Sequence, residues 1–192
     1  TPMQEQRCYA MRCSDRVGAT PGDRWRHRLD ALGPGKKVGL CWRSGLLTSA
    51  RQRSYPPIGD LALLWKVPGV FWINLQYDEC EAELAQVETD HGTRIHRWSG
   101  EDLRDDLENV VGLIGALDGV VTAPTAVSSL AGALGRRTWQ IDSGGDWSAL
   151  GEAHSPWFPT IEMIRRSPED QGWEPAVGRL AEVLGRWVRG EC

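Results

Sequence analysis

The sequence of 192 residues lacks the features that mark several large classes of protein. No apolar run reaches the roughly 18 residues needed to cross a membrane, and no charged start followed by an apolar core marks a signal peptide. Acidic side chains outnumber basic ones, 26 against 22, so the net charge of −4 gives no general positive field for nucleic acid. We therefore expect a cytoplasmic protein with no membrane span and no nucleic-acid partner, in which any anion site is local.

Cysteine pairs and the common nucleotide-binding motifs are missing too. The five cysteines are an odd number without a C-x-x-C pair, which favours reduced thiols over a disulfide framework or a zinc site. No G-x-G-x-x-G follows the first predicted strand, and "GPGKK" (33–37) precedes that strand, so it is not a P-loop. The four histidines lack metal-ligand spacing. NAD enzymes, P-loop NTPases and metalloenzymes are therefore disfavoured.

Aromatic residues are unevenly used. The sequence has two phenylalanines and three tyrosines, but ten tryptophans. Because Trp buries a large ring and needs a partner for its indole N–H, we expect some tryptophans to line a cleft or an interface.

What the sequence does contain is a repeated alternation of β-rich runs and helical patterns. The predicted strands are 37–42, 70–76, 93–98, 119–123, 137–142 and 161–166. The predicted helices are a short one from Asp23, then 57–66, 80–91, 102–117, 125–134, 146–152 and 173–189, with Ser99 and Asp102 as the cap of the fourth. Such alternation requires crossover connections, so it predicts an α/β fold with a doubly wound, mostly parallel, six-stranded Rossmann-like sheet.

The pattern also predicts how the chain is divided. Residues 1–35 are interpreted as a lead-in segment and short helix that follow a missing N-terminal region, because residues 1–21 show no clear period and only the short helix from Asp23 precedes the first strand. Residues 36–192 form the Rossmann-like domain.

Three loops that follow predicted strands have residues suited to an anion. Ligands of open parallel sheets bind outside the carboxyl ends of the strands, so these loops are expected to meet. The first loop holds Arg43, Arg51 and Arg53, whose guanidinium groups match phosphate or carboxylate oxygens. A solvated loop is the plain alternative.

The other two loops offer backbone groups. Thr125 stands at the expected start of a helix, where unpaired amides suit a phosphate, although it can equally be a simple cap. "DSGGDW" (142–147) has two glycines that allow close backbone approach, or else form an ordinary turn.

Four motifs in this order resemble a known family. They are "VGLCWRSG" (38–45), "FWINLQYDECEAEL" (71–84), "LIGALDGVVTAPTAVSSLAGALG" (113–135) and "SPWFPT" (155–160). They resemble the C-terminal half of bacterial TPR-containing glycosyltransferases, which are related to lipopolysaccharide heptosyltransferases and, more distantly, to O-GlcNAc transferase. The resemblance covers about residues 36–189. It implies a GT-B fold, in which two Rossmann-like domains face a cleft and the C-terminal one binds a nucleotide sugar without a metal or other cofactor.

The resemblance also implies a set of nucleotide-sugar-binding residues. They are Arg43, Ser44, Gly45, Arg51, Arg53, Gln76, Thr125, Ala126, Val127, Ser143, Gly144 and Gly145. In this family the catalytic base usually comes from the N-terminal half, which is absent here together with the TPR repeats. We therefore name no catalytic residue and expect the isolated half to be inactive.

Details of the motifs point to a subgroup and to one departure. "CWRSG" and "APTAV" resemble the alphaproteobacterial members tied to flagellin modification, whose donor would be a CMP-linked nonulosonic acid and whose acceptor would be a protein. Relatives commonly have "DTAVAHLAGAL", so Pro124 and Ser129 replace an Asp and a His. The sequence thus supports a donor-binding domain of a protein glycosyltransferase, with a catalytically silent docking module as the alternative.

Overall fold

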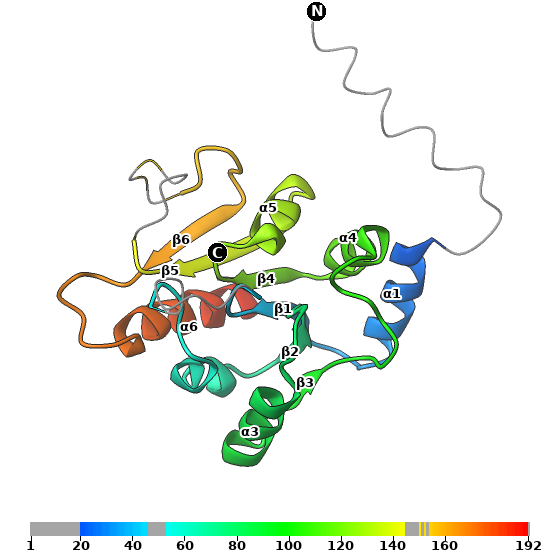
Figure 1. Ribbon diagram of the computed structural model, residues 1–192, viewed down its shortest axis with the longest axis horizontal. Coiled ribbons are helices and arrows are strands. Elements are labelled where there is room, and N and C mark those ends of the chain that lie inside the picture. Colours follow the sequence, from blue (N-terminus) through cyan, green and yellow to red (C-terminus); the bar gives the residue numbers. More distant parts are fainter. Residues whose placement is uncertain (1–19, 46–52, 145–149, 151, 153, 192) are drawn as a thin grey trace, which may run out of the picture.

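The computed structural model describes residues 20–45, 53–144, 150, 152 and 154–191 (Figure 1). Its strands are β1 (Lys36–Cys41), β2 (Val70–Asn74), β3 (Ile95–His96), β4 (Gly119–Thr122), β5 (Arg137–Asp142) and β6 (Ile161–Arg165). They form a single sheet in the order β3-β2-β1-β4-β5-β6, and every neighbouring pair is parallel. The predicted six-stranded, doubly wound sheet is confirmed. The order reverses between β1 and β4, which is where ligands bind in sheets of this kind.

Alternating side chains of the strands build a core on each face of the sheet. In β1, Val38 and Leu40 belong to one core, whereas Cys41 belongs to the other. The first core is covered by α3 (Glu81–His91), α6 (Glu174–Val188) and the two 3₁₀ turns η2 (Ile58–Leu61) and η3 (Leu64–Lys66). The second is covered by α1 (Pro21–Asp30), α4 (Leu107–Ala116) and α5 (Ala126–Ala133). Both faces are therefore shielded from water, as a parallel sheet requires.

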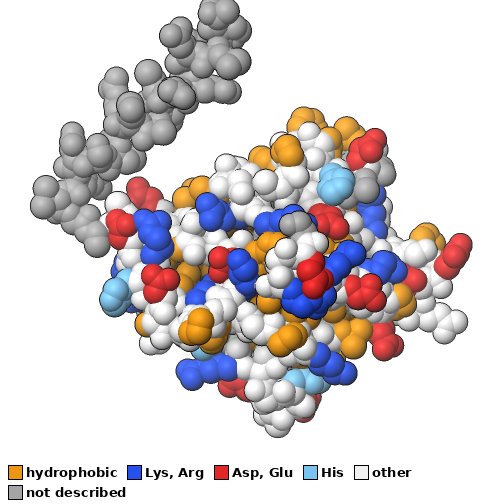
Figure 2. Space-filling view, turned by 180° about the vertical axis from the view of Figure 1, so that it is seen from behind, with side chains coloured by type: hydrophobic (Ala, Val, Ile, Leu, Met, Phe, Trp, Pro, Cys, Tyr) orange, Lys and Arg blue, Asp and Glu red, His pale blue; other side chains and the backbone are white. Residues whose placement is uncertain are grey.

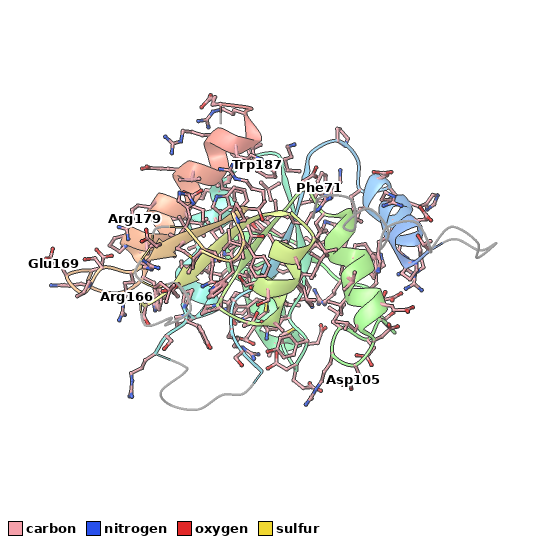
Figure 3. The ribbon with its side chains drawn as sticks, turned by 90° about the horizontal axis from the view of Figure 1, so that it is seen from above. Phe71, Asp105, Arg166, Glu169, Arg179 and Trp187 are labelled. Carbon is pink, nitrogen blue, oxygen red and sulfur yellow. The ribbon has the colours of Figure 1, made fainter. Side chains whose placement is uncertain are left out.

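The two layers of helices are distinguished in Figure 3, where α6 with Trp187 and Arg179 lies away from α1 and α4. The indole of Trp187 packs edge-on against Trp139 of β5, with 5.1 Å between the ring centroids. On the face shown in Figure 2, acidic and basic side chains are interspersed, in keeping with the small net charge.

Two of the expected helices differ from the structure. The segment 57–66 forms η2 and η3 instead of one α-helix; Pro57 precedes η2, and Pro68 follows η3. The predicted 102–117 helix begins only at Leu107, and its cap is Asp106, which accepts from the amide of Asn109 at 3.0 Å. Ser99 is not the cap, since Asp102 instead accepts the amides of Arg104 and Asp105 in a preceding turn.

The first helix begins slightly earlier than expected. Thr20 and Asp23 form a reciprocal capping box, and Pro21 occupies the first helical position, where its missing N–H costs nothing. Trp25 and Leu29 of α1 are buried against α4. The lead-in residues 1–19 and most of the predicted 146–152 helix lie outside the described residues. In the described part of the chain, no helix combines the length and apolarity that a membrane crossing requires.

Candidate functional site

The carboxyl ends of β1, β4 and β5 lie side by side at one edge of the sheet. Cys41 is in register with Thr122, and Thr122 with Gln140, so the three strands end at similar heights. The loops that follow them contain the residues predicted to bind an anion. The sequence therefore predicted correctly that these loops meet at one rim.

The Cys41 thiol lies at the centre of this rim. Its sulfur is 3.6 Å from Oε1 of Gln76 and 3.7 Å from Oγ1 of Thr125. It is fully buried, and this burial raises the pKa of the thiol to about 11, so the group stays neutral. The ends of β1 and β2 and the start of α5 are thus in direct contact.

The N-terminus of α5 presents unpaired backbone donors. In the part of the chain that the structure describes, the amides of Ala126 and Val127 have no hydrogen-bond partner, and Ala126 is exposed. Thr125 has an extended backbone, but its hydroxyl does not cap the helix and lies 3.5 Å from the hydroxyl of Thr122. The expected side-chain cap is therefore absent from α5, and a bound anion can take its place.

Buried polar groups fix α5 to the end of β5. Oγ of Ser128 donates to Oε1 of Gln140 at 2.6 Å, and Nε2 of Gln140 lies 3.4 Å from Oδ2 of Asp142. Asp142, which is 1% exposed, accepts the amide of Gly144 at 2.6 Å. Gly144 has a φ of +83°, a conformation that glycine adopts without strain. Ser143 lies between them, and Gly145 is outside the described residues.

Arg43, the first arginine of the predicted anion loop, is occupied by side chains of the protein itself. Its guanidinium binds Asp78 and Glu83 and donates to the carbonyl oxygen of Glu79 at 3.0 Å. Burial disfavours its charged form, but the hydrogen bonds to Glu83 and Asp78 outweigh this effect and hold the pKa of Arg43 above its ordinary value. Direct phosphate binding by Arg43 stays a prediction, and it would require these partners to be displaced.

The other residues predicted around this loop have different environments. Gln76 is buried and donates to the Arg43 carbonyl at 3.1 Å and to Asp78 at 2.7 Å. Ser44 is buried, and the amide of Gly45 donates to the Tyr77 hydroxyl at 3.0 Å. Arg53 lies in an exposed turn before η2, and Arg51 is outside the described residues.

A large open pocket lies beside the rim, and it was not predicted from the sequence. It has a volume of about 1170 Å³ and is formed by the segments that follow β2 and β3, from Asn74 to Glu81 and from Arg97 to Arg104. Gln76 and Asp78 border it and also contact the β1 loop. Its signal in the sequence is the pair of runs "QYDE" (76–79) and "RWSGED" (97–102), which begin at the ends of the predicted strands 70–76 and 93–98.

Tryptophans and ion pairs build the walls of this pocket. Trp25 and Trp98 pack edge to face with 5.1 Å between ring centroids, which confirms that some tryptophans line a cleft. Glu101 is held by Arg24 at 3.2 Å and by Arg28 at 2.5 Å. Burial opposes ionisation of Glu101, but the hydrogen bond from Arg28 and the charges of both arginines lower its pKa.

The opposite wall carries a second set of ion pairs. Arg97 binds Glu81 at 2.8 Å and Glu88 at 3.0 Å. This set thus holds one positive and two negative side chains. Across the described ranges, no group of three acidic, histidine or cysteine side chains is placed to hold a metal ion.

The fold is that of one half of a GT-B glycosyltransferase. The chain superposes on Escherichia coli ADP-heptose lipopolysaccharide heptosyltransferase II with a TM-score of 0.61 and 17% identity, over 89% of this chain and 52% of that one. It superposes on E. coli heptosyltransferase WaaC, solved with ADP-2-deoxy-2-fluoro heptose, with a TM-score of 0.57 and 14% identity, over 79% of this chain and 44% of WaaC. At these identities the likeness concerns the fold.

One curated protein is similar in sequence. Protein FlbA of Caulobacter vibrioides is 37% identical over 161 residues, which are 83% of this chain and 27% of FlbA. The chain thus spans about a quarter of FlbA and about half of each heptosyltransferase. No protein-family model matches the sequence.

Proposed function

We propose that this chain is the nucleotide-sugar-binding half of a glycosyltransferase. The observation that carries the proposal is the rim at β1, β4 and β5. There the amides of Ala126 and Val127, which have no hydrogen-bond partner among the described residues, face the same edge as Gly144. The fold shared with the heptosyltransferases supports it, since one of these was solved with an ADP-heptose analogue.

In this proposal the donor phosphate binds at the start of α5. The positive end of the helix and the N–H groups of Ala126 and Val127 stabilise its charge, with Thr125, Ser143 and Gly144 at its border. Arg53 supplies positive charge, and Arg51 and Gly145, which lie outside the described residues, stay predicted contacts of the donor. When the bond between the sugar carbon and the phosphate oxygen breaks and the sugar bonds to the acceptor, oriented donors stabilise the negative charge left on the phosphate, without a metal.

The nucleoside extends from the rim into the neighbouring pocket. Gln76 connects the two places, because it borders the pocket and lies 3.6 Å from the Cys41 sulfur, which in turn contacts Thr125. Trp98 and Tyr77 offer aromatic surface for a base there, and the carboxylates of the wall can accept from an amino group.

The finer assignment concerns the donor and acceptor. We propose a CMP-linked nonulosonic acid as donor and a protein, flagellin, as acceptor, which rests on the "CWRSG" and "APTAV" motifs. The remaining half of the catalytic unit and TPR repeats would come from the rest of a longer protein. Among the described cysteines, Cys41 and Cys80 are free thiols, which supports a reducing, cytoplasmic setting.

A docking module without donor binding is the second candidate function. Trp157 is 63% exposed, which suits a protein contact, and Pro124 stands where relatives have an Asp. This candidate predicts no nucleotide binding at the rim.

A proline substitution tests the proposal without breaking the helix. Ala126 is the first residue of α5, a position that tolerates proline, and Thr125 before it has a ψ of 178°, which suits a residue that precedes proline. Ala126→Pro therefore removes one N–H donor and little else. Ala126→Ser keeps the N–H and is the matched control.

We expect calorimetry to show that the purified protein binds one of CMP, UDP or ADP more tightly than the corresponding nucleoside. A hydrogen bond to a charged group contributes about 1.5–3 kcal/mol, so Ala126→Pro should weaken nucleotide binding by roughly tenfold or more. Nucleoside binding should not change, and Ala126→Ser should behave as the unaltered protein. Failure of every nucleotide to bind at millimolar concentration would favour the docking module. If Ala126→Pro bound the nucleotide as tightly as the unaltered protein, the phosphate would not bind at the start of α5.

A further inference from the structure

The guanidinium of Arg43 has each of its nitrogens occupied. Nε lies 3.2 Å from both carboxylate oxygens of Glu83, Nη2 is 2.5 Å from Oε2 of Glu83, and Nη1 binds Asp78. Its side chain is only 12% exposed. A phosphate would therefore have to displace at least one carboxylate to reach it.

The local charge also opposes a phosphate at this place. One guanidinium lies between two carboxylates, so the cluster of Arg43, Asp78 and Glu83 has a net charge of −1 when all three are ionised. Two negative side chains surround one positive side chain, so this cluster does not attract an anion. Arg43 therefore does not create a positively charged site in the folded protein.

The contacts of Arg43 instead join three segments that are distant in sequence. Its backbone carbonyl accepts from Gln76 at the end of β2, and its side chain reaches Glu83 in the first turn of α3. The indole of Trp42 donates to the same Glu83 carboxylate at 3.0 Å. The end of β1 is therefore fixed to β2 and α3 by both side chain and backbone.

This junction also sets the boundary between the rim and the pocket. Beyond Arg43, the amide of Gly45 donates to Tyr77, and Tyr77 and Asp78 both line the pocket. A Cβ at Gly45 would lie 2.8 Å from the Tyr77 ring, so the two segments approach closely. On the other side, Cys41 contacts Thr125 at the start of α5.

We propose that Arg43 is a positioning residue for the donor and does not bind its phosphate. Its pairs with Glu83 and Asp78 hold residues 42–45 after β1, so that Tyr77 and Gln76 form the wall between the pocket and the rim. This inference rests on the proposed nucleotide-binding function. It gives Asp78 and Glu83 the same positioning role as Arg43.

The two possible roles of Arg43 predict opposite effects of Glu83→Ala. If Arg43 bound the phosphate, loss of Glu83 would leave the guanidinium less neutralised, and nucleotides would bind more tightly. If Arg43 positions the loop, Glu83→Ala should weaken binding as Arg43→Ala does. Glu83 does not line the pocket, so the effect is not one of direct contact.

The experiment measures CMP and cytidine binding by calorimetry for Arg43→Ala, Glu83→Ala and the double variant. We expect each single variant to weaken both ligands by a similar factor of roughly 3 to 30, and the double variant to be no weaker than the worse single one. The control pair is Arg137→Ala and Glu162→Ala, which breaks an ion pair at the amino end of β5, away from the rim, and should leave binding unchanged. Tighter CMP binding by Glu83→Ala, or an Arg43→Ala defect limited to CMP, would overturn the inference.

Amide hydrogen exchange separates this inference from the proposed function. Positioning by Arg43 predicts that Arg43→Ala and Glu83→Ala both speed exchange of the Gly45 and Gln76 amides in the protein without ligand. Unchanged exchange at these amides would refute the positioning role even where nucleotides bind. If these amides exchanged faster in both variants but the unaltered protein bound no nucleotide, the proposed function would be refuted. The positioning of this segment by Arg43 would still hold.

Discussion

Two glycines of α4 allow a sharp test of how α1 is attached to the domain. A Cβ at Gly112 would lie 2.8 Å from Cβ of Pro21 and 3.0 Å from the amide nitrogen of Gly22 in α1. These are ring and backbone atoms, and the capping box of Thr20 and Asp23 fixes them in place. At Gly115, one turn further along α4, a Cβ would meet no atom within 4 Å.

The two substitutions to alanine should therefore have opposite effects on stability. Replacing glycine by alanine inside a helix stabilises by up to about 1 kcal/mol, which is the whole effect expected at Gly115. At Gly112 the added methyl group forces α1 away from α4, and overpacking of this kind costs about 1–3 kcal/mol. We expect Gly112→Ala to lower the free energy of unfolding by up to about 2 kcal/mol and Gly115→Ala to raise it by up to about 1 kcal/mol.

Urea unfolding followed by circular dichroism measures both changes, with an unchanged m-value as the sign that the unfolding transition itself is the same. A stabilising effect of the same size at both positions would refute the close contact of α1 with α4. The result matters for the pocket as well, because α1 carries Trp25, which packs against Trp98 in the pocket wall.

Two further predictions concern pH and the buried network at β5. Burial and the charge of Arg94 lower the pKa of His96 below its ordinary 6.5. The unfolded chain therefore takes up this proton first as pH falls below 6.5, so the free energy of unfolding should decline from pH 7 to pH 5. The decline should be smaller in His96→Asn. Urea unfolding at both pH values measures it, and an equal loss of unfolding free energy in the two proteins would contradict this prediction. Ser128→Ala removes the donor to Gln140 and should lower the unfolding free energy by about 0.5–1.5 kcal/mol, whereas an unchanged urea midpoint would show that this hydrogen bond contributes nothing.

The sheet could be predicted from sequence because each strand is a short apolar run bounded by turn residues. All six strands occur at the expected places, although the third is reduced to Ile95 and His96. Segment 57–66 was mistaken for an α-helix because its apolar spacing is also compatible with two 3₁₀ turns between prolines. The start of α4 was misplaced because several acidic residues in a row can each cap a helix, and only the fold selects Asp106.

The site was predictable only in part. That the loops after β1, β4 and β5 meet follows from parallel strands, which end at a common edge. The pairing of Arg43 with Asp78 and Glu83 could not be predicted, because these residues lie 35 and 40 positions further along the chain. The pocket was missed for a similar reason, since its walls come from α1, β3 and the segment after β2, which no local pattern connects.

The start of α5 and Gly144 hold the phosphate of a nucleotide in the proposed site. Amide chemical shifts of the ¹⁵N-labelled protein test it directly, with a nucleotide and its nucleoside added in parallel. We predict that the nucleotide shifts the amides of Ala126, Val127 and Gly144 and that the nucleoside leaves them in place. Shifts confined to other segments, or the same shifts with both ligands, would show that the phosphate does not bind at the start of α5.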